Sequence, residues 1–161
     1  MITISLNKIN ELDKKLIDLA IKIREKSYCP YSNYAVGAAL LAENDEFFLG
    51  CNIESSDYTL TTHAEMLAVD NMVQSGNRKI KKIAIALIGK GEIPATPCGL
   101  CRQKILEFDK EGNCEIIIAN LNHNNEIVNI TYFTLSELLP FSFNSSFLKY
   151  FLNFETSNNN Q

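Results

Sequence analysis

The sequence predicts a single α/β domain in which a mixed β-sheet carries helices on its faces. The main observation is the order of helical and strand-like segments, α-β-β-α-β-α-β-β, which is typical of this architecture. The length of 161 residues fits one domain. A composition of 46% hydrophobic and 21% charged residues is that of a globular protein, not of a disordered or fibrous one.

Helices are predicted where apolar side chains recur every three or four residues. Residues 6–26 show this spacing, and the pattern ends before Pro30, which cannot continue a helix. A second helix is expected to end near Gly76, a residue type that commonly follows helix C-termini. The helices after the first are expected at residues 63–74, 98–112 and 136–139.

Strands are predicted at residues 35–42, 47–51, 82–88, 115–119 and 127–130. The first two are separated by the polar segment Glu43–Glu46, which predicts an antiparallel hairpin. The run 82–88 is almost entirely apolar, as in a strand that is covered on both faces. Residues 156–161 are polar and rich in asparagine, and we expect this end of the chain to be frayed.

Charge and cysteine content restrict the function classes. The net charge of −4 argues against nucleic acid as a partner, because phosphate binding usually requires a basic surface. The one basic cluster, residues 78–82, is interpreted as a solvated turn. No stretch reaches the roughly 18 apolar residues of a membrane span, and residues 1–8 lack the apolar core of a signal peptide. Five cysteines without a disulfide-framework spacing fit a reducing compartment, so a cytoplasmic location is expected.

Two short motifs contain metal-ligand chemistry: His63-Ala64-Glu65 and Pro97-Cys98-Gly99-Leu100-Cys101. Cys98 and Cys101 stand at a predicted helix start, where both sulfurs can face one point and the helix dipole favours thiolates. His63 supplies a third ligand if the two helix N-termini converge. Three protein ligands leave a fourth position for water, which is the arrangement of a catalytic zinc. Zinc lowers the pKa of such a water to about 7.

Glu65 follows His63 by two residues and can therefore reach the metal-bound water without binding the metal. In that position it would accept the proton of the water and deliver it to the substrate. Other readings stay open: Thr62-x-x-Glu65 is also a capping box, and Cys-x-x-Cys is also found as a redox pair. These readings do not explain why both motifs stand at successive helix starts separated by one strand. His123 is interpreted as a loop residue, and the cysteines outside the motif, Cys29, Cys51 and Cys114, as buried small apolar side chains.

From about Tyr31 to Phe143 the chain resembles the cytidine deaminase family. His-x-Glu followed by Pro-Cys-x-x-Cys is the signature of zinc deaminases that act on nucleobases. Two more segments are similar to the family, Tyr31–Leu40 (YSNYAVGAAL) and Gly50–Glu54 (GCNIE). The resemblance implies a three-layer α/β/α sandwich around a five-stranded mixed sheet. It implies Zn²⁺ on His63, Cys98 and Cys101, catalysis by Glu65, and hydrolysis of cytidine or deoxycytidine to uridine or deoxyuridine plus ammonia in pyrimidine salvage.

The same resemblance implies a set of substrate contacts. Asn52 and Glu54 would bind the ribose 3′-hydroxyl, since an amide and a carboxylate can both accept its hydrogen bond and the amide can also donate. Tyr34 would line the pyrimidine pocket. Three further contacts involve the backbone. Backbone groups of Ala64 and Cys98 would contact the edge of the base, and the Thr96 carbonyl would contact the departing amine.

The resemblance also implies a homotetramer, in which Phe143 stacks on a pyrimidine bound by a neighbouring chain. Phe141 is the alternative stacking residue because of the Phe-Ser-Phe spacing, and packing of both side chains in their own core is a further alternative. The likeness ends at residue 143. Residues 1–143 are therefore assigned to the domain and residues 144–161 to a C-terminal extension.

The sequence departs from the family pattern at the first zinc ligand. Single-domain members often use three cysteines, with an arginine just after the catalytic glutamate that offsets the extra negative charge. Here the ligand is His63 and the following residue is Met66. The histidine ligand and the absence of the arginine are consistent with each other. Two thiolates already neutralise Zn²⁺, so no compensating positive side chain is required. The residues after Glu54 also differ from the usual small or amide residues.

Other zinc deaminases and a non-catalytic zinc protein are the alternatives to this function. Among zinc deaminases, a tRNA adenosine deaminase is disfavoured by the acidic charge, and a deoxycytidylate deaminase by Glu54, which would repel a phosphate. A blasticidin S deaminase stays open, because this antibiotic also contains a cytosine. A non-catalytic zinc module is the alternative from another class, although it would not need Glu65 beside an open metal position.

Overall fold

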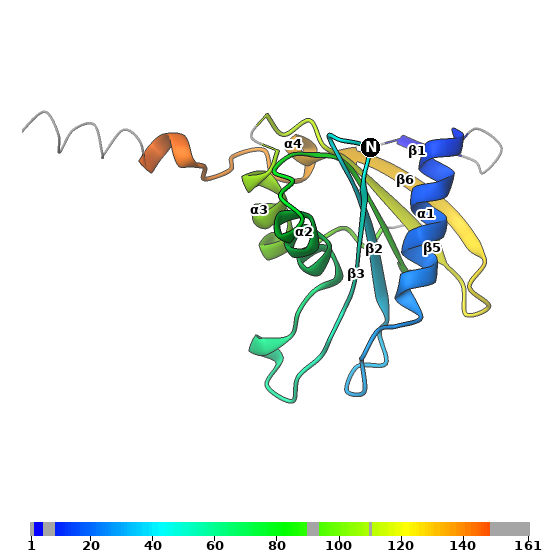
Figure 1. Cartoon of the computed structure of the whole chain (residues 1–161). Helices are drawn as coiled ribbons and strands as arrows, with labels where there is room; N and C mark the ends of the chain where they lie inside the picture. Colours follow the sequence, from blue (N-terminus) through cyan, green and yellow to red (C-terminus); the bar gives the residue numbers. More distant parts are fainter. Residues whose placement is uncertain (1, 5–8, 90–93, 110, 149–161) are drawn as a thin grey trace, which may run out of the picture.

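The structure is a computed structural model that describes residues 2–4, 9–89, 94–109 and 111–148. All helices and strands expected from the sequence are present (Figure 1). Along the chain the elements are β1 (Ile2–Ile4), α1 (Glu11–Arg24), β2 (Val36–Ala42), β3 (Phe47–Cys51), a 3-10 helix (Tyr58–Leu60), α2 (Ala64–Gln74), β4 (Ile80–Ile88), α3 (Gly99–Glu107), β5 (Glu115–Leu121), β6 (Ile127–Thr134) and α4 (Leu135–Leu138).

The strands form one mixed sheet in the order β1-β6-β5-β4-β2-β3. Strands β4 and β5 are parallel, whereas the other neighbouring pairs are antiparallel. Strands β2 to β6 are the five expected ones, and β2 and β3 form the predicted hairpin. The three-residue strand β1 adds a sixth at the edge, where Ile2 pairs with Tyr132. The sequence analysis did not predict β1, because so short a segment has no recognisable periodicity.

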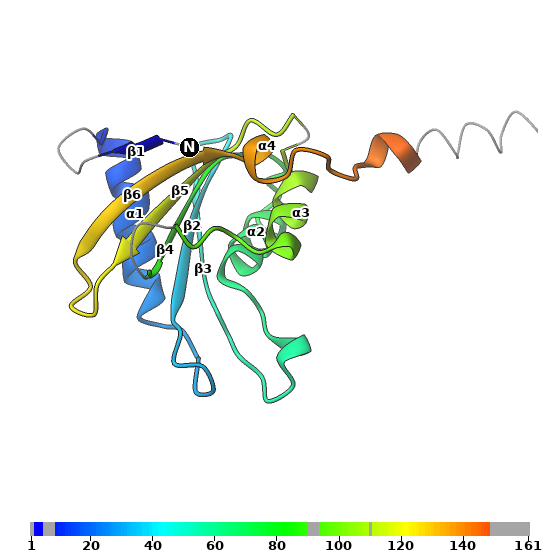
Figure 2. The same ribbon diagram turned by 180° about the vertical axis from the view of Figure 1, so that it is seen from behind.

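Helices cover both faces of the sheet, so the predicted three-layer α/β/α sandwich is confirmed (Figures 1 and 2). On one face α1 packs Leu16, Ile17 and Ala20 against the sheet. On the other face α2 and α3 contribute apolar side chains that include Met72 and Ile105. The central strands β2, β4 and β5 are buried on both faces, which explains their nearly continuous apolar sequences.

The end of α3 and the surroundings of Lys82 differ from the sequence-based expectation. Helix α3 ends at Glu107 and not near Gly112. There the Asp109 carboxylate accepts hydrogen bonds from the N–H groups of Asn113 and Cys114, at 3.2 and 2.7 Å, and so holds a turn. Lys82 does not belong to a solvated turn. Its Nζ lies 2.9 Å from the buried Asp13 and 2.7 Å from the half-exposed Glu115.

The C-terminal part of the chain leaves the sandwich after α4. Residues 145–148 are helical, and in both views this segment projects away from the sheet (Figures 1 and 2). The expected fraying of residues 156–161 lies outside the described residues. Among the described residues, no helix is long and apolar enough to cross a membrane.

Candidate active site

Two helix N-termini converge on the predicted metal site. His63 is the N-cap of α2 and Cys98 is the N-cap of α3, and neither side chain makes a capping hydrogen bond. The capping-box reading of Thr62 and Glu65 is therefore wrong, since Thr62 is not at the N-cap. At both positions a possible metal ligand replaces the usual capping side chain. The free N–H groups of the two first turns create a positive potential, which favours thiolates here.

The spacing of the three side chains fits a tetrahedral zinc ion. His63 Nδ1 lies 3.3 Å from Cys101 Sγ and 3.4 Å from Cys98 Sγ, and the two sulfurs are 3.6 Å apart. Zinc with Zn–S of about 2.3 Å and Zn–N of about 2.0–2.1 Å places its ligand atoms about 3.5–3.8 Å apart. His63, Cys98 and Cys101 are the group of possible metal ligands that the described residues contain.

Burial adds a chemical reason for a cation at this place. Burial, together with the nearby Glu65 and Cys98, raises the pKa of the Cys101 thiol. A buried thiolate beside a carboxylate is costly without a compensating positive charge. Zn²⁺ supplies that charge and binds the thiolate form. The donor set therefore fits zinc, with three protein ligands from two helices.

Glu65 lies in the first turn of α2 and is 6% exposed. Burial raises the pKa of its carboxyl, while hydrogen bonds with its own backbone and with Cys101 and the charge of His63 oppose this effect. The side chain lines the same pocket as His63. A buried carboxylate next to a metal site can transfer protons without exchange with bulk solvent.

A pocket of about 470 Å³ brings together most of the predicted substrate-binding residues. This volume suits a small organic ligand. The predicted residues that line it are Tyr34, Asn52, Glu54, His63, Ala64, Glu65 and Thr96. Cys98 is not part of the lining, although its sulfur is close to His63.

Asn52 and Glu54 are both buried and tightly held. The Asn52 side chain accepts a hydrogen bond from the Val36 N–H at 2.8 Å and donates one to the Tyr34 carbonyl at 2.9 Å. Each end of the amide is thereby fixed. Because the amide has two N–H donors and its oxygen has two lone pairs, one donor and one lone pair remain for a ligand.

The Glu54 carboxylate is oriented by the segment before β2. It accepts hydrogen bonds from the backbone N–H groups of Tyr31 and Ser32, at 3.0 and 3.2 Å, and from the Ser32 hydroxyl. The Ser32 hydroxyl, followed by these N–H groups, lowers the pKa of Glu54, so this carboxyl is ionised at neutral pH. Ser32 also lines the pocket. We did not single it out from the sequence, although it stands in the segment Tyr31–Leu40.

Thr96 is held next to the metal site by a residue that the sequence analysis also missed. Arg102, one residue after Cys101, donates to the Pro97 carbonyl at 2.7 Å, to Thr96 Oγ1 at 2.7 Å and to the Leu138 carbonyl at 2.9 Å. These bonds join the loop before α3 to the end of α4. The signal was present in the sequence, since Arg102 follows the Cys-x-x-Cys motif directly.

The two C-terminal aromatic side chains do not pack in the core of their own chain. Phe141 is 99% exposed and Phe143 is 60% exposed. Phe143 stacks on Phe147, with ring centroids 5.7 Å apart, and its carbonyl accepts a hydrogen bond from Gln103. Neither phenylalanine lines the 470 Å³ pocket. The alternative of packing within the core is therefore wrong.

Of the three cysteines outside the motif, which were expected to be buried, two are buried. Cys51 and Cys114 are buried, whereas Cys29 is only half-buried. All five cysteines are free thiols. His123 lies exposed in the β5–β6 turn, as expected for a loop residue.

The fold and the site together define a zinc-dependent hydrolytic enzyme with a His-Cys-Cys metal centre and a buried carboxylate. Residues 10–116 match the family model described as the cytidine and deoxycytidylate deaminase zinc-binding region. The chain therefore belongs to this cytidine and deoxycytidylate deaminase family.

Individual relatives support the same assignment. The chain is 42% identical to the cytidine deaminase of Sporosarcina psychrophila over 137 residues, which are 85% of this chain and 95% of the relative. It is 38% identical to the cytidine deaminase of Halalkalibacterium halodurans over 80% of this chain and 91% of the relative. Among solved structures, the cytidine deaminase of Burkholderia pseudomallei superposes with a TM-score of 0.73 at 34% identity, covering 84% of this chain and all of the other.

Proposed function

We propose that the protein hydrolyses cytidine or deoxycytidine to uridine or deoxyuridine and ammonia, a reaction of pyrimidine salvage. The observation that carries this proposal is the position of Glu65, buried in one pocket with a zinc ligand and with two residues suited to a sugar hydroxyl. A structural zinc site has no need for such a carboxylate beside an open metal position.

The chemistry assigned to each residue follows from its place. Zinc on His63, Cys98 and Cys101 would supply the Lewis acid that activates water for hydrolysis. Glu65 accepts a proton from the attacking water, passes it to the ring nitrogen and later protonates the leaving amine. Burial keeps this carboxylate away from bulk water, so that it can also carry the second proton, which leaves the hydroxyl newly added to the ring and reaches the departing amine.

Base and sugar are assigned to opposite parts of the pocket. The backbone groups of Ala64 and Cys98 face the edge of the base, the Thr96 carbonyl accepts from the departing amine, and Tyr34 borders the ring. Asn52 and Glu54 bind the 3′-hydroxyl through the lone pairs and the donor that their fixed hydrogen bonds leave free. An ionised Glu54 favours a hydroxyl over a phosphate at this place.

We infer that the active enzyme is a homo-oligomer, and a tetramer is favoured by the family resemblance. In a single chain Cys98 is exposed, although hydrolysis requires that the reacting centre be screened from bulk water. Phe141 and Phe143 are exposed aromatic side chains that a neighbouring chain would cover. Phe143 would stack on the pyrimidine bound by that chain. The five free thiols support a cytoplasmic location.

The test is ammonia release from cytidine by the zinc-loaded protein, measured before and after treatment with a zinc chelator. We expect release that the chelator abolishes and that added zinc restores. The same assay with deoxycytidine, adenosine, deoxycytidylate and blasticidin S compares the rival zinc deaminases. Faster turnover of any of the last three than of both nucleosides would refute the proposed substrate, and no turnover of any of them would favour a non-catalytic zinc module.

A further inference from the structure

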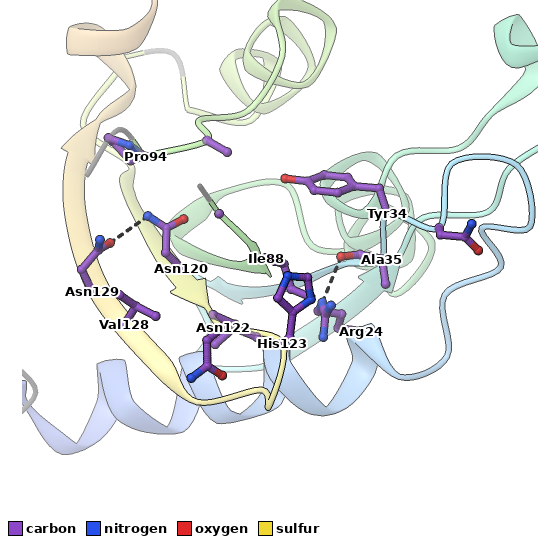
Figure 3. A pocket seen from close by; sticks show the side chains of 14 residues that line it. Arg24, Tyr34, Ala35, Ile88, Pro94, Asn120, Asn122, His123, Val128 and Asn129 are labelled. Carbon is purple, nitrogen blue, oxygen red and sulfur yellow. Dashed lines mark hydrogen bonds between the residues drawn. The ribbon is translucent and has the colours of Figure 1, made fainter. Parts of the chain in front are cut away.

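A second cavity lies beside the zinc pocket and has no part in the chemistry proposed above. Its volume is about 960 Å³, compared with about 470 Å³ for the zinc pocket. Figure 3 shows its walls, which come from the end of α1, from the ends of β4 and β5 and from the β5–β6 turn. Tyr34 and Ala95 belong to both pockets. A cavity of this size can hold a small metabolite.

Arg24, the last residue of α1, places a buried positive charge in this wall. It is 8% exposed. Its Nε donates to the Ala35 carbonyl at 2.9 Å, and one terminal nitrogen donates to Asn125 Oδ1 at 2.7 Å. Both acceptors are uncharged. Since a guanidinium has five N–H donors, part of its donor edge is left for another partner.

No carboxylate compensates this charge within the described residues. None of the ion pairs formed between them includes Arg24. The described lining of the cavity contains no Asp or Glu. A buried cation is costly unless it is paired. A cavity whose described lining is positive and free of carboxylates is complementary to an anion.

Asn120, in the wall of the same cavity, has an unmatched hydrogen-bond acceptor. The residue is 2% exposed, and its Nδ2 donates to Asn129 Oδ1 at 2.8 Å. Its Oδ1 is buried without a hydrogen-bond partner. In Figure 3 this oxygen points away from Asn129. It lies against Gly89, where an added Cβ would stand 2.5 Å from it, so it is not open to the cavity. Recognition of a ligand in the cavity therefore rests on Arg24.

We propose that this cavity is a second ligand site, which takes a small molecule with an oxyanion for Arg24. The oxyanion is a phosphate or a carboxylate, both of which match the planar guanidinium. Apolar side chains of the lining, including Ile88 and Leu121, accommodate the carbon skeleton. Because Tyr34 lines both pockets, occupation of this cavity changes the rate of deamination, a consequence that rests on the proposed function.

The direct test is isothermal titration of the zinc-loaded protein at constant ionic strength, with inorganic phosphate and with acetate as separate probes. Saturable binding of one anion per chain is expected, and the stronger of the two probes identifies the oxyanion. The variant Arg24→Gln keeps a donor for the Ala35 carbonyl but removes the charge. Its affinity should fall by about tenfold or more, as for loss of a hydrogen bond between charged groups.

Lys22→Gln is the matched control, because it removes the same charge from an exposed position of the same helix. Its affinity for the anion should equal that of the unmodified chain. If Arg24→Gln does not fold, amide NMR of the unmodified chain replaces it. The bound anion should then shift the signals of Gly89, Asn120 and His123.

Three results would overturn the proposal. They are the absence of saturable binding, an equal loss of affinity in Lys22→Gln, and NMR shifts confined to the zinc pocket. A neighbouring chain whose carboxylate contacts Arg24 in the assembled protein would overturn it as well. Anion binding is measured without turnover, so failure of this proposal is distinguishable from failure of the deaminase proposal.

Discussion

The backbone of Gly50 in β3 lies directly against the carbonyl of Ala64 in α2. A Cβ atom on Gly50 would stand 2.2 Å from the Ala64 oxygen and 2.5 Å from the Ala68 nitrogen. Both obstacles are backbone atoms, which cannot move without the helix. This contact fixes the distance between β3 and the helix whose first turn contains His63 and Glu65. Gly50, the first residue of the segment that contains the predicted sugar contacts Asn52 and Glu54, therefore also positions the metal site.

Gly50→Ala should destabilise the protein by about 1–3 kcal/mol or more, as overpacking in a dense core does. Zinc affinity should fall with it, because α2 has to shift. Thermal unfolding and zinc titration measure the two effects. Gly99→Ala is the control, since a Cβ there would meet no atom within 4 Å. Equal stability of the two variants would mean that β3 and α2 are not in this contact.

Cys101→Ser should lose zinc and lower the unfolding temperature, because the metal joins the N-termini of two helices. The purified unmodified protein should contain one zinc per chain, since the described residues provide one set of three ligands. Elemental analysis measures both. Cys114→Ser is the comparison. Cys114 is buried directly before β5 but does not belong to the group of metal ligands, so this variant should retain zinc. Activity without any bound zinc would contradict the proposed mechanism.

Glu65→Ala should keep the fold and the zinc but lower kcat by about 10²–10⁴-fold or more, because one carboxylate serves several proton transfers. The loss of about 1 kcal/mol that follows removal of a capping-box residue is not expected, since the N-cap of α2 is His63 and not Thr62. Rate and thermal melting are measured on the same preparation. A variant with normal kcat and reduced melting temperature would assign Glu65 a structural role instead.

Glu54→Ala should lower kcat/KM for cytidine sharply, and free cytosine should be a very poor substrate. A site built to hydrogen-bond a hydroxyl disfavours an analogue without it, because buried polar groups are then left unpaired. Asn52→Ala should also cost stability, since its amide holds the backbone of Val36 and Tyr34. Steady-state kinetics on both substrates provide the measurement. Comparable rates on cytosine and cytidine would rule out the sugar assignment.

A mixture of Glu65→Ala chains and Phe143→Ala chains should regain activity after subunit exchange, if Phe143 completes the pocket of a neighbour. Some mixed sites then contain both unmodified residues, as symmetric assembly requires. Light scattering checks the oligomeric state, and labelled chains show that exchange has occurred. Phe141→Ala in place of Phe143→Ala tests the alternative residue. No recovery despite exchange would place the stacking residue in the same chain as the zinc.

The sequence by itself determined the elements and the metal ligands. Periodicity and turn residues act over a few neighbouring positions, so the helices and the five main strands could be predicted to within a few residues. His63, Cys98 and Cys101 were found for the same reason, because each motif is contained in one helix start. The order of the two motifs along the chain then indicated that they act together.

Only the tertiary structure decided how residues from distant segments meet. Thr62 and His63 are adjacent, and the packing of α2 selected His63 as the N-cap, which excluded the capping box. Lys82 is paired because α1 and β5 bring Asp13 and Glu115 to it, a contact between distant segments that no local sequence pattern predicts. The exposure of Phe143 and the unpaired charge of Arg24 likewise depend on contacts between distant parts of the chain, since burial is a property of the folded surface.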